Sequence, residues 1–457
     1  RDILEKSEVS DLCDYIRSFG LDVIPEVQSW SHTQYITTAY PELAEVPEGE
    51  IKTSKVIDSY AEDIRPAQFY KHSMCPSHER YYDVIFGILD EVLEVVKPQK
   101  YVHMGHDEIY ELCICEKCKN LNAGDLYAKE VTTLNNYIKS KNLTMMIWSD
   151  MIQERSYKSL SAINKLPKDV IMLDFIWYFH LDQDLEDNLL NHGFNVVIGN
   201  AYSSYYPRFE TRSKKEGIIG AEVSAWVACD EDTYSFEGKM YDYIYMANCL
   251  WNRNYDGAMR LTYDEAMRSI LIDTRRRIGE LDFNGEEKRL SFKSDRINVP
   301  ADLVGYIPYE EAAVVTSDMS EVSIDFNGYA KQFTFVQAMD ADADRFAWLP
   351  ATVIGSYTLN YEDGTSYSRD IRFGDDIHSY RFRFGTPLKS HLFRHEGYIA
   401  SYSARPECGK TAFGEDYTLF DNFVKNPTPE KKIVGITLKH NKNTDANIIL
   451  FDAKATV

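Results

Sequence analysis

Two adjacent carboxylates, Asp107 and Glu108, are the residues best suited to chemistry in this sequence. They follow the largely apolar segment Tyr101–Met104, at the end of a predicted buried strand. Burying two carboxylates is costly unless a function requires them. Because each negative charge raises the pKa of the other, one group can stay protonated while its neighbour stays anionic. The pair therefore indicates acid–base catalysis, and a purely structural pair is the alternative.

Six short apolar runs in the first 280 residues predict the strands that position this pair. They are residues 21–27, 101–108, 144–151, 170–177, 195–202 and 218–227. Amphipathic helical patterns lie between them, such as Arg80–Val96, and strands that alternate with helices predict βαβ units and a parallel sheet. Several runs end in Asp, Glu, Trp or Tyr, and in a barrel the carboxyl ends of the strands form the active-site face.

The predicted fold class is α/β, with a (β/α)8 TIM-type barrel over residues 1–290. Such a barrel has eight strands, and the sequence shows six. Either two strands escape detection or the first strands precede Arg1, and a first residue other than Met favours the second explanation. We therefore predict that the catalytic barrel is incomplete at its N-terminus in this chain.

From about residue 300 the apolar pattern changes to a period of two, with a turn signal roughly every ten residues. Examples are Val322–Phe326, Ser356–Tyr361 followed by Glu-Asp-Gly, Arg381–Phe384 and Lys432–Leu438. This pattern predicts an antiparallel β-sandwich domain over residues 300–457. The polar stretch Ser294–Ala301 marks the expected boundary.

The segment around the carboxylates resembles the His-x-Gly-Gly-Asp-Glu signature of glycoside hydrolase family 20, the β-N-acetylhexosaminidases. His103, Gly105, Asp107 and Glu108 match, and His106 replaces the second glycine. Segments 23–32, 74–76 and 148–151, with Trp177 and Trp226, are similar in the same order. The resemblance covers about residues 1–260 and is closest to the hexosaminidase D-like branch, which lacks a secretory signal and tends to prefer N-acetylgalactosaminides.

This resemblance implies substrate-assisted retaining catalysis, in which the 2-acetamido oxygen of the sugar is the nucleophile. Glu108 would protonate the departing oxygen and then deprotonate water. Asp107 would accept the acetamido N–H and stabilise the charged intermediate. The resemblance implies no cofactor and no catalytic metal, because the family-20 reaction needs none.

The resemblance also implies substrate-binding residues. His103 would orient the carboxylate pair, and His32 would lie behind it, although each histidine could instead fill a hydrogen-bonded niche. The candidates that would bind the acetamido group are Trp148, Trp177, Trp226 and Tyr205, with Tyr206 or Tyr202 as alternatives to Tyr205. Core packing is the alternative for each tryptophan. A Glu that many members carry two residues after the last tryptophan is Ala228 here, followed by Asp230 and Glu231, so the preference between gluco and galacto sugars stays open.

Four of the eight cysteines lie at Cys75, Cys113, Cys115 and Cys118. Cys115 and Cys118 have the spacing of zinc ligands, but a zinc site usually shows two such pairs. A structural zinc site and free thiols both remain open. The scattered cysteines favour a reducing compartment, and we expect a cytoplasmic protein.

The composition excludes some partners. A formal charge of −22 argues against binding to nucleic acid or an anionic membrane, and no apolar run approaches the length of a membrane span. The expected partner is a glycan or glycoconjugate that contains N-acetylhexosamine. The predicted function is an exo-acting β-N-acetylhexosaminidase that hydrolyses terminal GalNAc or GlcNAc β-glycosides. The alternatives are a non-catalytic carbohydrate-binding barrel and a hydrolase of another barrel family that uses adjacent carboxylates.

Overall fold

A computed structural model of the chain describes residues 3–46, 73–153, 158–174, 184–199, 209–225, 239–252, 269–294, 298–318, 320–340, 352–374, 376–381 and 404–457. The described residues form two compact units, one ending at Ser224 and the other beginning at Ala225. This division falls earlier in the chain than the boundary predicted near residues 294–301. No helix within the described ranges is both long enough and apolar enough to cross a bilayer.

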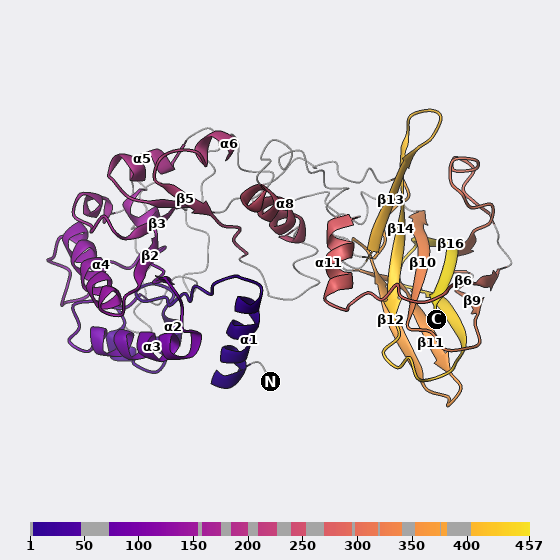
Figure 1. The fold of residues 1–457 in the computed structure, drawn as a ribbon, viewed down its shortest axis with the longest axis horizontal. Helices are drawn as coiled ribbons and strands as arrows, with labels where there is room; N and C mark the ends of the chain where they lie inside the picture. Colours follow the sequence, from indigo (N-terminus) through magenta and orange to yellow (C-terminus); the bar gives the residue numbers. More distant parts are fainter. Residues whose placement is uncertain are drawn as a thin grey trace. The chain divides into compact units, whose positions relative to one another are not determined.

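The first unit alternates helices with short strands (Figure 1). In chain order its elements are α1 (Lys6–Ser18), α2 (Gln34–Thr37), η1 (Pro41–Leu43), α3 (Tyr81–Val96), β1 (Tyr101–His103), α4 (Ala123–Ser140), β2 (Thr144–Trp148), η2 (Asp150–Ile152), η3 (Leu160–Asn164), β3 (Ile171–Asp174), α5 (Glu186–Asn191), β4 (Val196–Ile198), α6 (Phe209–Arg212) and β5 (Ile218–Ala221). The strands form one parallel sheet in the order β1-β2-β3-β4-β5. The prediction of an α/β region with a parallel sheet is confirmed.

Both faces of this sheet are covered, which explains the nearly continuous apolar runs of its strands. On one face Met145 and Ile147 of β2 belong to a large core shared with the helices, including Ile85 of α3 and Leu134 of α4. On the other face Trp148 belongs to a separate buried cluster with Met146, Ile171 and Leu173.

Local signals in the sequence fix the two long helices. The predicted helix Arg80–Val96 is confirmed as α3, which buries Ile85 and Leu89 one turn apart. It ends at Val96 and is followed by Lys97 in a left-handed conformation. Helix α4 begins after Asn122, whose side chain accepts the backbone N–H of Asp125 at 3.0 Å.

Five of the six predicted parallel strands are confirmed, and β1, β2, β4 and β5 end sooner than their apolar runs. The segment 21–27 is the exception and contains no strand. Leu21 is 47% exposed and Ile24 is 42% exposed, whereas Val27 is buried, so only the end of this run belongs to the core. Glu26 nevertheless forms a parallel bridge with His103, which places the following residues beside the end of β1.

The second unit contains two helices and eleven strands within the described residues. These elements are α8 (Lys239–Trp251), α11 (Leu271–Arg277), β6 (Glu287–Arg289), β7 (Ser291–Lys293), β8 (Ala313–Val315), β9 (Glu321–Asp325), β10 (Gln332–Asp340), β11 (Val353–Tyr361), β12 (Ser366–Arg372), β13 (Ala404–Lys410), β14 (Asp416–Lys425), β15 (Ile433–His440) and β16 (Asn447–Thr456). One antiparallel sheet has the order β13-β14-β10-β16-β6, with β8 also paired to β16, and the other has the order β12-β11-β15-β9-β7.

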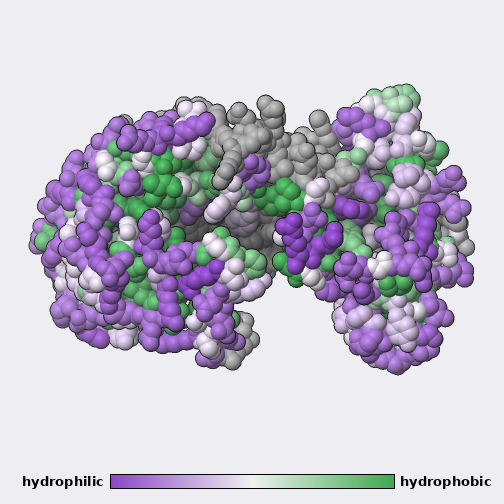
Figure 2. All heavy atoms as spheres, in the orientation of Figure 1, coloured by the Kyte–Doolittle hydropathy of each residue, from purple (hydrophilic) through white to green (hydrophobic). Residues whose placement is uncertain are grey.

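The two antiparallel sheets share one apolar core. Phe335 of β10 stacks on Tyr357 of β11 with ring centroids 3.8 Å apart, so side chains of both sheets meet face to face. The predicted period-two segments 322–326, 356–361 and 432–438 fall on β9, β11 and β15, while residues 382–384 lie outside the described ranges. Hydrophilic side chains cover most of the face of the described surface seen in Figure 2, as the charged composition leads one to expect.

Candidate active site

The loop after β1 carries the carboxylate pair. Strand β1 ends at His103, which is in register with Met146 of β2, so the loop begins at the carboxyl end of the parallel sheet. Gly105, His106 and Glu108 adopt left-handed backbone conformations, with φ of 70°, 79° and 51°. Because a strand cannot continue through such conformations, β1 stops early and the chain turns over the end of the sheet.

Glycine is needed at position 105 for two reasons: the backbone has a positive φ, and there is no room for a side chain. A Cβ atom at this position would lie 1.9 Å from Oε1 of Gln28. The Nε2 group of Gln28 donates a hydrogen bond to Oδ1 of Asp107 at 2.9 Å. The missing side chain of Gly105 therefore leaves the space in which Gln28 reaches Asp107.

His32 joins the two carboxylates directly. Its Nε2 atom lies 3.4 Å from Oδ2 of Asp107 and 3.2 Å from Oε2 of Glu108, and both carboxylates are buried. Burial by itself lowers the pKa of His32, but hydrogen bonds to the two carboxylates and their negative charges outweigh it and raise this pKa to about 10. The imidazole is therefore protonated at neutral pH and partly neutralises the pair.

Asp107 has the surroundings of a permanent anion. Burial raises its pKa, but hydrogen bonds from His32 and Gln28 and the charge of His32 outweigh this effect and hold the pKa below its usual value. The Ser31 hydroxyl donates to the backbone carbonyl of Asp107 and so holds the backbone of this residue. Asp107 is thus held ionised and oriented.

Glu108 has a different set of partners. The Tyr110 hydroxyl donates to Oε1 of Glu108 at 2.9 Å, and Oε2 faces His32. The backbone N–H of Glu108 donates to Oδ2 of Asp150 at 3.0 Å. Asp150 follows β2 as Glu108 follows β1, so two neighbouring parallel strands bring these acidic groups together.

Asp150 is a third buried carboxyl group beside the pair. Burial and the nearby charge of Asp107 raise its pKa well above the usual value, and the N–H of Glu108 opposes this only in part. Its Oδ1 atom has no hydrogen-bond partner among the described residues. Asp150 therefore fits the neutral acid form, which supports Glu108 without adding a third negative charge.

An Asp150→Asn variant should consequently become more stable relative to the wild type as pH rises. Above about pH 4 the unfolded chain releases the proton of Asp150, whereas the raised pKa keeps this proton bound in the folded protein. The free energy of unfolding of the wild type therefore falls as pH rises towards the folded pKa. Asparagine keeps the acceptor for the Glu108 N–H and takes no part in titration. Urea unfolding at pH 4 and pH 8 measures the effect, with Asp11→Asn on the exposed face of α1 as the control. A difference from the wild type that does not grow with pH contradicts the expectation.

His106 turns away from the carboxylates into a buried network. Its Nδ1 atom lies 3.0 Å from the Met104 carbonyl, and its Nε2 atom lies 2.7 Å from Oε2 of Glu130. The Tyr81 hydroxyl donates to Oε1 of Glu130 at 2.8 Å. His106 and Glu130 are both fully buried, and Glu130 comes from the inner face of α4. His106, the bulky residue that replaces the second glycine of the signature, is therefore accommodated by its contact with Glu130 of α4.

His103 and Trp148 lie together at the strand ends. The ring of His103 meets that of Trp148 edge to face, with centroids 5.1 Å apart. Nδ1 of His103 lies 3.3 Å from Oε1 of Glu26, and Nε1 of Trp148 donates to the same oxygen at 3.3 Å. The direct contact with the carboxylate pair thus comes from His32, whereas His103 contacts Glu26 and Trp148.

His32, Asp107 and Glu108 also have the spacing of a cation site. The raised pKa of His32 favours a protonated ring, whose Nε2 donates to the carboxylates rather than binding a metal. The histidine itself therefore supplies the positive charge that the pair requires.

The family model of the glycosyl hydrolase family 20 catalytic domain matches residues 1–254, which are more than half of the 457 residues. The chain belongs to glycosyl hydrolase family 20. The family predicted from the signature-like residues 103–108 is thereby confirmed.

Individual relatives are distant. β-Hexosaminidase subunit A2 of Dictyostelium discoideum is 22% identical over 245 residues, which are 49% of this chain and 41% of that protein. A β-hexosaminidase of Akkermansia muciniphila is 27% identical over 119 residues, 25% of this chain and 22% of that protein. The chain spans less than half the length of these relatives. A family-20 exo-β-N-acetylglucosaminidase from Vibrio harveyi, solved with N-acetylglucosamine, aligns with a TM-score of 0.32 and 17% identity over 50% of this chain and 35% of that one.

Several predicted site residues of this family-20 domain lie outside the described residues. They are Trp177, Trp226 and Tyr205, with Tyr202, Tyr206, Ala228, Asp230 and Glu231. Their roles remain predictions. The structure places the other predicted residues, His32, His103, Asp107, Glu108 and Trp148, at one end of the parallel sheet.

Three residues of the site escaped the sequence prediction: Gln28, Tyr110 and Asp150. Tyr110 comes two residues after Glu108, and Asp150 comes two residues after Trp148 at the end of β2. Polar side chains just past the ends of predicted parallel strands are the signal that identifies them, because such ends gather at one edge of the sheet.

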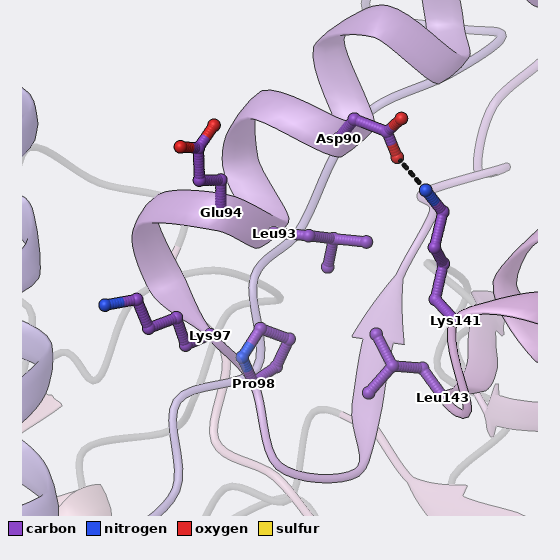
Figure 3. A pocket seen from close by; sticks show the side chains of 7 residues that line it. All are labelled: Asp90, Leu93, Glu94, Lys97, Pro98, Lys141 and Leu143. Carbon is purple, nitrogen blue, oxygen red and sulfur yellow. Dashed lines mark ion pairs between the residues drawn. The ribbon is translucent and has the colours of Figure 1, made fainter.

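A hollow of about 410 Å³ lies elsewhere on the same unit, between the end of α3 and the start of β2 (Figure 3). Pro98 and Leu143 line it where the chain enters β1 and β2, and Asp90 and Lys141 pair across it at 2.7 Å. It therefore opens at the amino ends of the strands, opposite the carboxylate pair. In a TIM-type barrel this is the side that serves stability.

Proposed function

We propose that this chain is an exo-acting β-N-acetylhexosaminidase that hydrolyses terminal GalNAc or GlcNAc β-glycosides by substrate-assisted retention. The observation that carries the proposal is the buried pair Asp107 and Glu108 at the carboxyl end of the parallel sheet of a family-20 domain. The unequal surroundings of the two carboxylates support separate roles. His32 contacts both carboxylates, but Gln28 donates to Asp107 alone and the Tyr110 hydroxyl donates to Glu108 alone.

In the first step the 2-acetamido oxygen of the sugar attacks the anomeric carbon as the bond to the leaving oxygen breaks. Glu108 gives its proton to that oxygen, and the sugar becomes a cyclic oxazolinium ion. Asp107 accepts a hydrogen bond from the acetamido N–H, and its negative charge stabilises the positive charge of the ion. A carboxylate that is ionised before substrate binds needs no rearrangement to do this.

In the second step water attacks the anomeric carbon from the side that the leaving group vacated. Glu108, now a carboxylate, takes a proton from this water, and the carbon–oxygen bond of the oxazolinium ring breaks. The product keeps the β configuration because the carbon is inverted twice. The Tyr110 hydroxyl stabilises the carboxylate form of Glu108 between the two steps, as its hydrogen bond to Oε1 indicates.

The fold proposed around this site is a (β/α)8 barrel over residues 1–290, followed by a β-sandwich over residues 300–457. The second buried cluster of the parallel sheet supports the barrel, because Met146, Trp148, Ile171 and Leu173 face away from the helices and are nonetheless buried. The core shared by the two antiparallel sheets supports the sandwich. Membership of the hexosaminidase D-like branch, a preference for N-acetylgalactosaminides and a cytoplasmic location are further parts of the proposal.

Trp148, Trp177, Trp226 and Tyr205 are proposed to enclose the acetamido group, as the family resemblance implies. Trp148 supports this assignment by its position at the end of β2, on the same edge of the sheet as Asp107. Its indole N–H is bound to Glu26, which fixes the plane of the ring.

The test is hydrolysis of aryl β-N-acetylgalactosaminide and aryl β-N-acetylglucosaminide by the full chain, with Asp107→Asn as the control of strongly reduced activity. We expect cleavage of at least one substrate and competitive inhibition by a thiazoline that mimics the oxazoline. Binding of the thiazoline without hydrolysis would instead indicate a carbohydrate-binding protein. Hydrolysis that the thiazoline leaves unaffected would argue against substrate assistance.

A further inference from the structure

Three thiols and one carboxylate converge next to the loop that carries the catalytic pair. The ligand atoms of Glu45, Cys75, Cys115 and Cys118 all lie within 4.8 Å of one another. The sulfur of Cys115 is 3.3 Å from that of Cys75 and 3.2 Å from that of Cys118. Cys118 lies 2.7 Å from Oε1 of Glu45. The cysteines are free, so the cluster is not a set of disulfides.

Glu45 is the unusual member of this cluster. It is only 2% exposed, and it has no cationic partner among the described residues. Its Oε1 atom accepts the backbone N–H groups of Ile114 and Cys115, at 2.6 and 3.1 Å, in addition to the thiol of Cys118. Buried carboxylates are normally paired with a cation or bound to a metal.

A second cluster of acidic residues in the same unit is neutralised by basic side chains, as is usual. Asp184, Glu186 and Asp187 also lie close enough to hold a cation, but Arg212 and Lys215 already neutralise them. At Glu45 the neighbouring side chains are thiols, which become anionic when they bind a metal and therefore add to the need for a cation.

The geometry fits a tetrahedral ion with soft ligands. Four ligands around zinc, with sulfur about 2.3 Å from the metal, place the sulfurs about 3.8 Å apart. The observed sulfur separations of 3.2 and 3.3 Å are within about half an ångström of that arrangement. Three thiolates and one carboxylate suit zinc better than magnesium or calcium, which prefer oxygen ligands throughout.

We propose that Glu45, Cys75, Cys115 and Cys118 bind a structural zinc ion. The assignment replaces Cys113, one of the four cysteines marked by the sequence, with a glutamate that lies 30 residues before Cys75 in the chain. The Cys113 thiol contacts that of Cys118, but it is not part of the group of four mutually close ligand atoms. A site closed by four protein ligands leaves no position for a substrate, so this zinc serves structure and not the reaction.

The ion would connect three segments of the first unit. Glu45 follows η1, and its backbone N–H donates to the Ser73 carbonyl at 2.8 Å. Cys75 donates its backbone N–H to the Leu43 carbonyl at 2.8 Å. Cys115 and Cys118 lie between the catalytic loop and α4. Zinc would therefore fix the far end of the loop that carries Asp107, Glu108 and Tyr110.

The test is the metal content of the full chain, purified under reducing conditions and measured by inductively coupled plasma mass spectrometry. We expect one zinc per chain in the wild type and in Cys113→Ser, and loss of the zinc in Cys75→Ser and Cys118→Ser. Glu45→Gln should weaken zinc binding at least tenfold, as measured by competition with a chromogenic chelator. Loss of zinc in Cys113→Ser with retention in Glu45→Gln would overturn the assignment of the fourth ligand.

Cobalt(II) added to the chelator-treated wild type provides a measurement that does not depend on variants folding. We expect the absorption of a tetrahedral ion and a thiolate-to-cobalt charge-transfer band with the intensity of three thiolates, unchanged in Cys113→Ser. An absence of both zinc and cobalt binding at micromolar concentrations overturns the site. A mass lower by two hydrogens under non-reducing conditions, without bound metal, also overturns it, because the thiols would then form a disulfide.

Discussion

A Glu108→Gln variant is expected to hydrolyse an N-acetylhexosaminide with an alkyl leaving group about 10²–10⁴-fold more slowly than the wild type, the usual contribution of general acid–base catalysis. Glutamine fills the same space beside Tyr110 and His32 but has no proton to give. The loss should therefore appear in kcat, with KM little changed. Steady-state kinetics with the full chain measure both constants.

The leaving group separates the role of Glu108 from that of Asp107. A nitrophenolate leaves without a proton. In Glu108→Gln the rate of the first step should therefore fall much less with a nitrophenyl glycoside than with an alkyl glycoside. Asp107→Asn should lose about 10²–10³-fold with both, since it removes stabilisation of the charged intermediate whatever group departs. An equal loss of kcat/KM, which reports the first step, for Glu108→Gln with both substrates would contradict its assignment as the acid.

A Glu130→Ala variant is expected to destabilise the first unit by about 1–3 kcal/mol, the usual cost of leaving a buried hydrogen-bonding group without its partner. The substitution leaves the Nε2 group of His106 without its partner inside the core, while the Tyr81 hydroxyl keeps the Ser29 carbonyl as an acceptor at 3.0 Å. His106 is also held at a φ of 79°, so its backbone cannot relax without moving the carboxylates that follow. Urea unfolding followed by tryptophan fluorescence measures the free energy.

The matched control is Glu79→Ala, which removes an exposed carboxylate paired with Lys117. That change should have little effect on stability, because surface ion pairs contribute little. The double variant Glu130→Ala with His106→Ala should cost less than the sum of the single changes, because the two residues lose the same interaction. Strict additivity would mean that the His106–Glu130 contact does not stabilise the fold.

Much of the fold could be predicted from the sequence because burial leaves a periodic pattern. The spacing of Ile85 and Leu89 predicts α3, and the apolar runs predict the starts of β1 to β5. The ends of the strands could not be predicted in the same way. Met104 is as apolar as Val102, yet the chain leaves the sheet there because Gly105 and His106 adopt positive φ, and hydrophobicity does not reveal this.

The site could be predicted only in part. Asp107 and Glu108 stand out through their adjacency and their family resemblance, and both lie where a barrel prediction puts them. The contacts that distinguish them include those made by Gln28 and Asp150, which come from other segments of the chain. Only the three-dimensional arrangement shows that His32, rather than His103, touches both carboxylates.

The ties between Leu43–Glu45 and Ser73–Cys75 also bear on the cost of ordering the proposed metal ligands. Ala44 and Met74 form an antiparallel bridge, so backbone hydrogen bonds already align the segments that carry Glu45 and Cys75. An ion that binds ligands already held in place removes less conformational entropy than one that must order them. The site should therefore bind zinc more tightly than a peptide that carries the same four residues without this pairing.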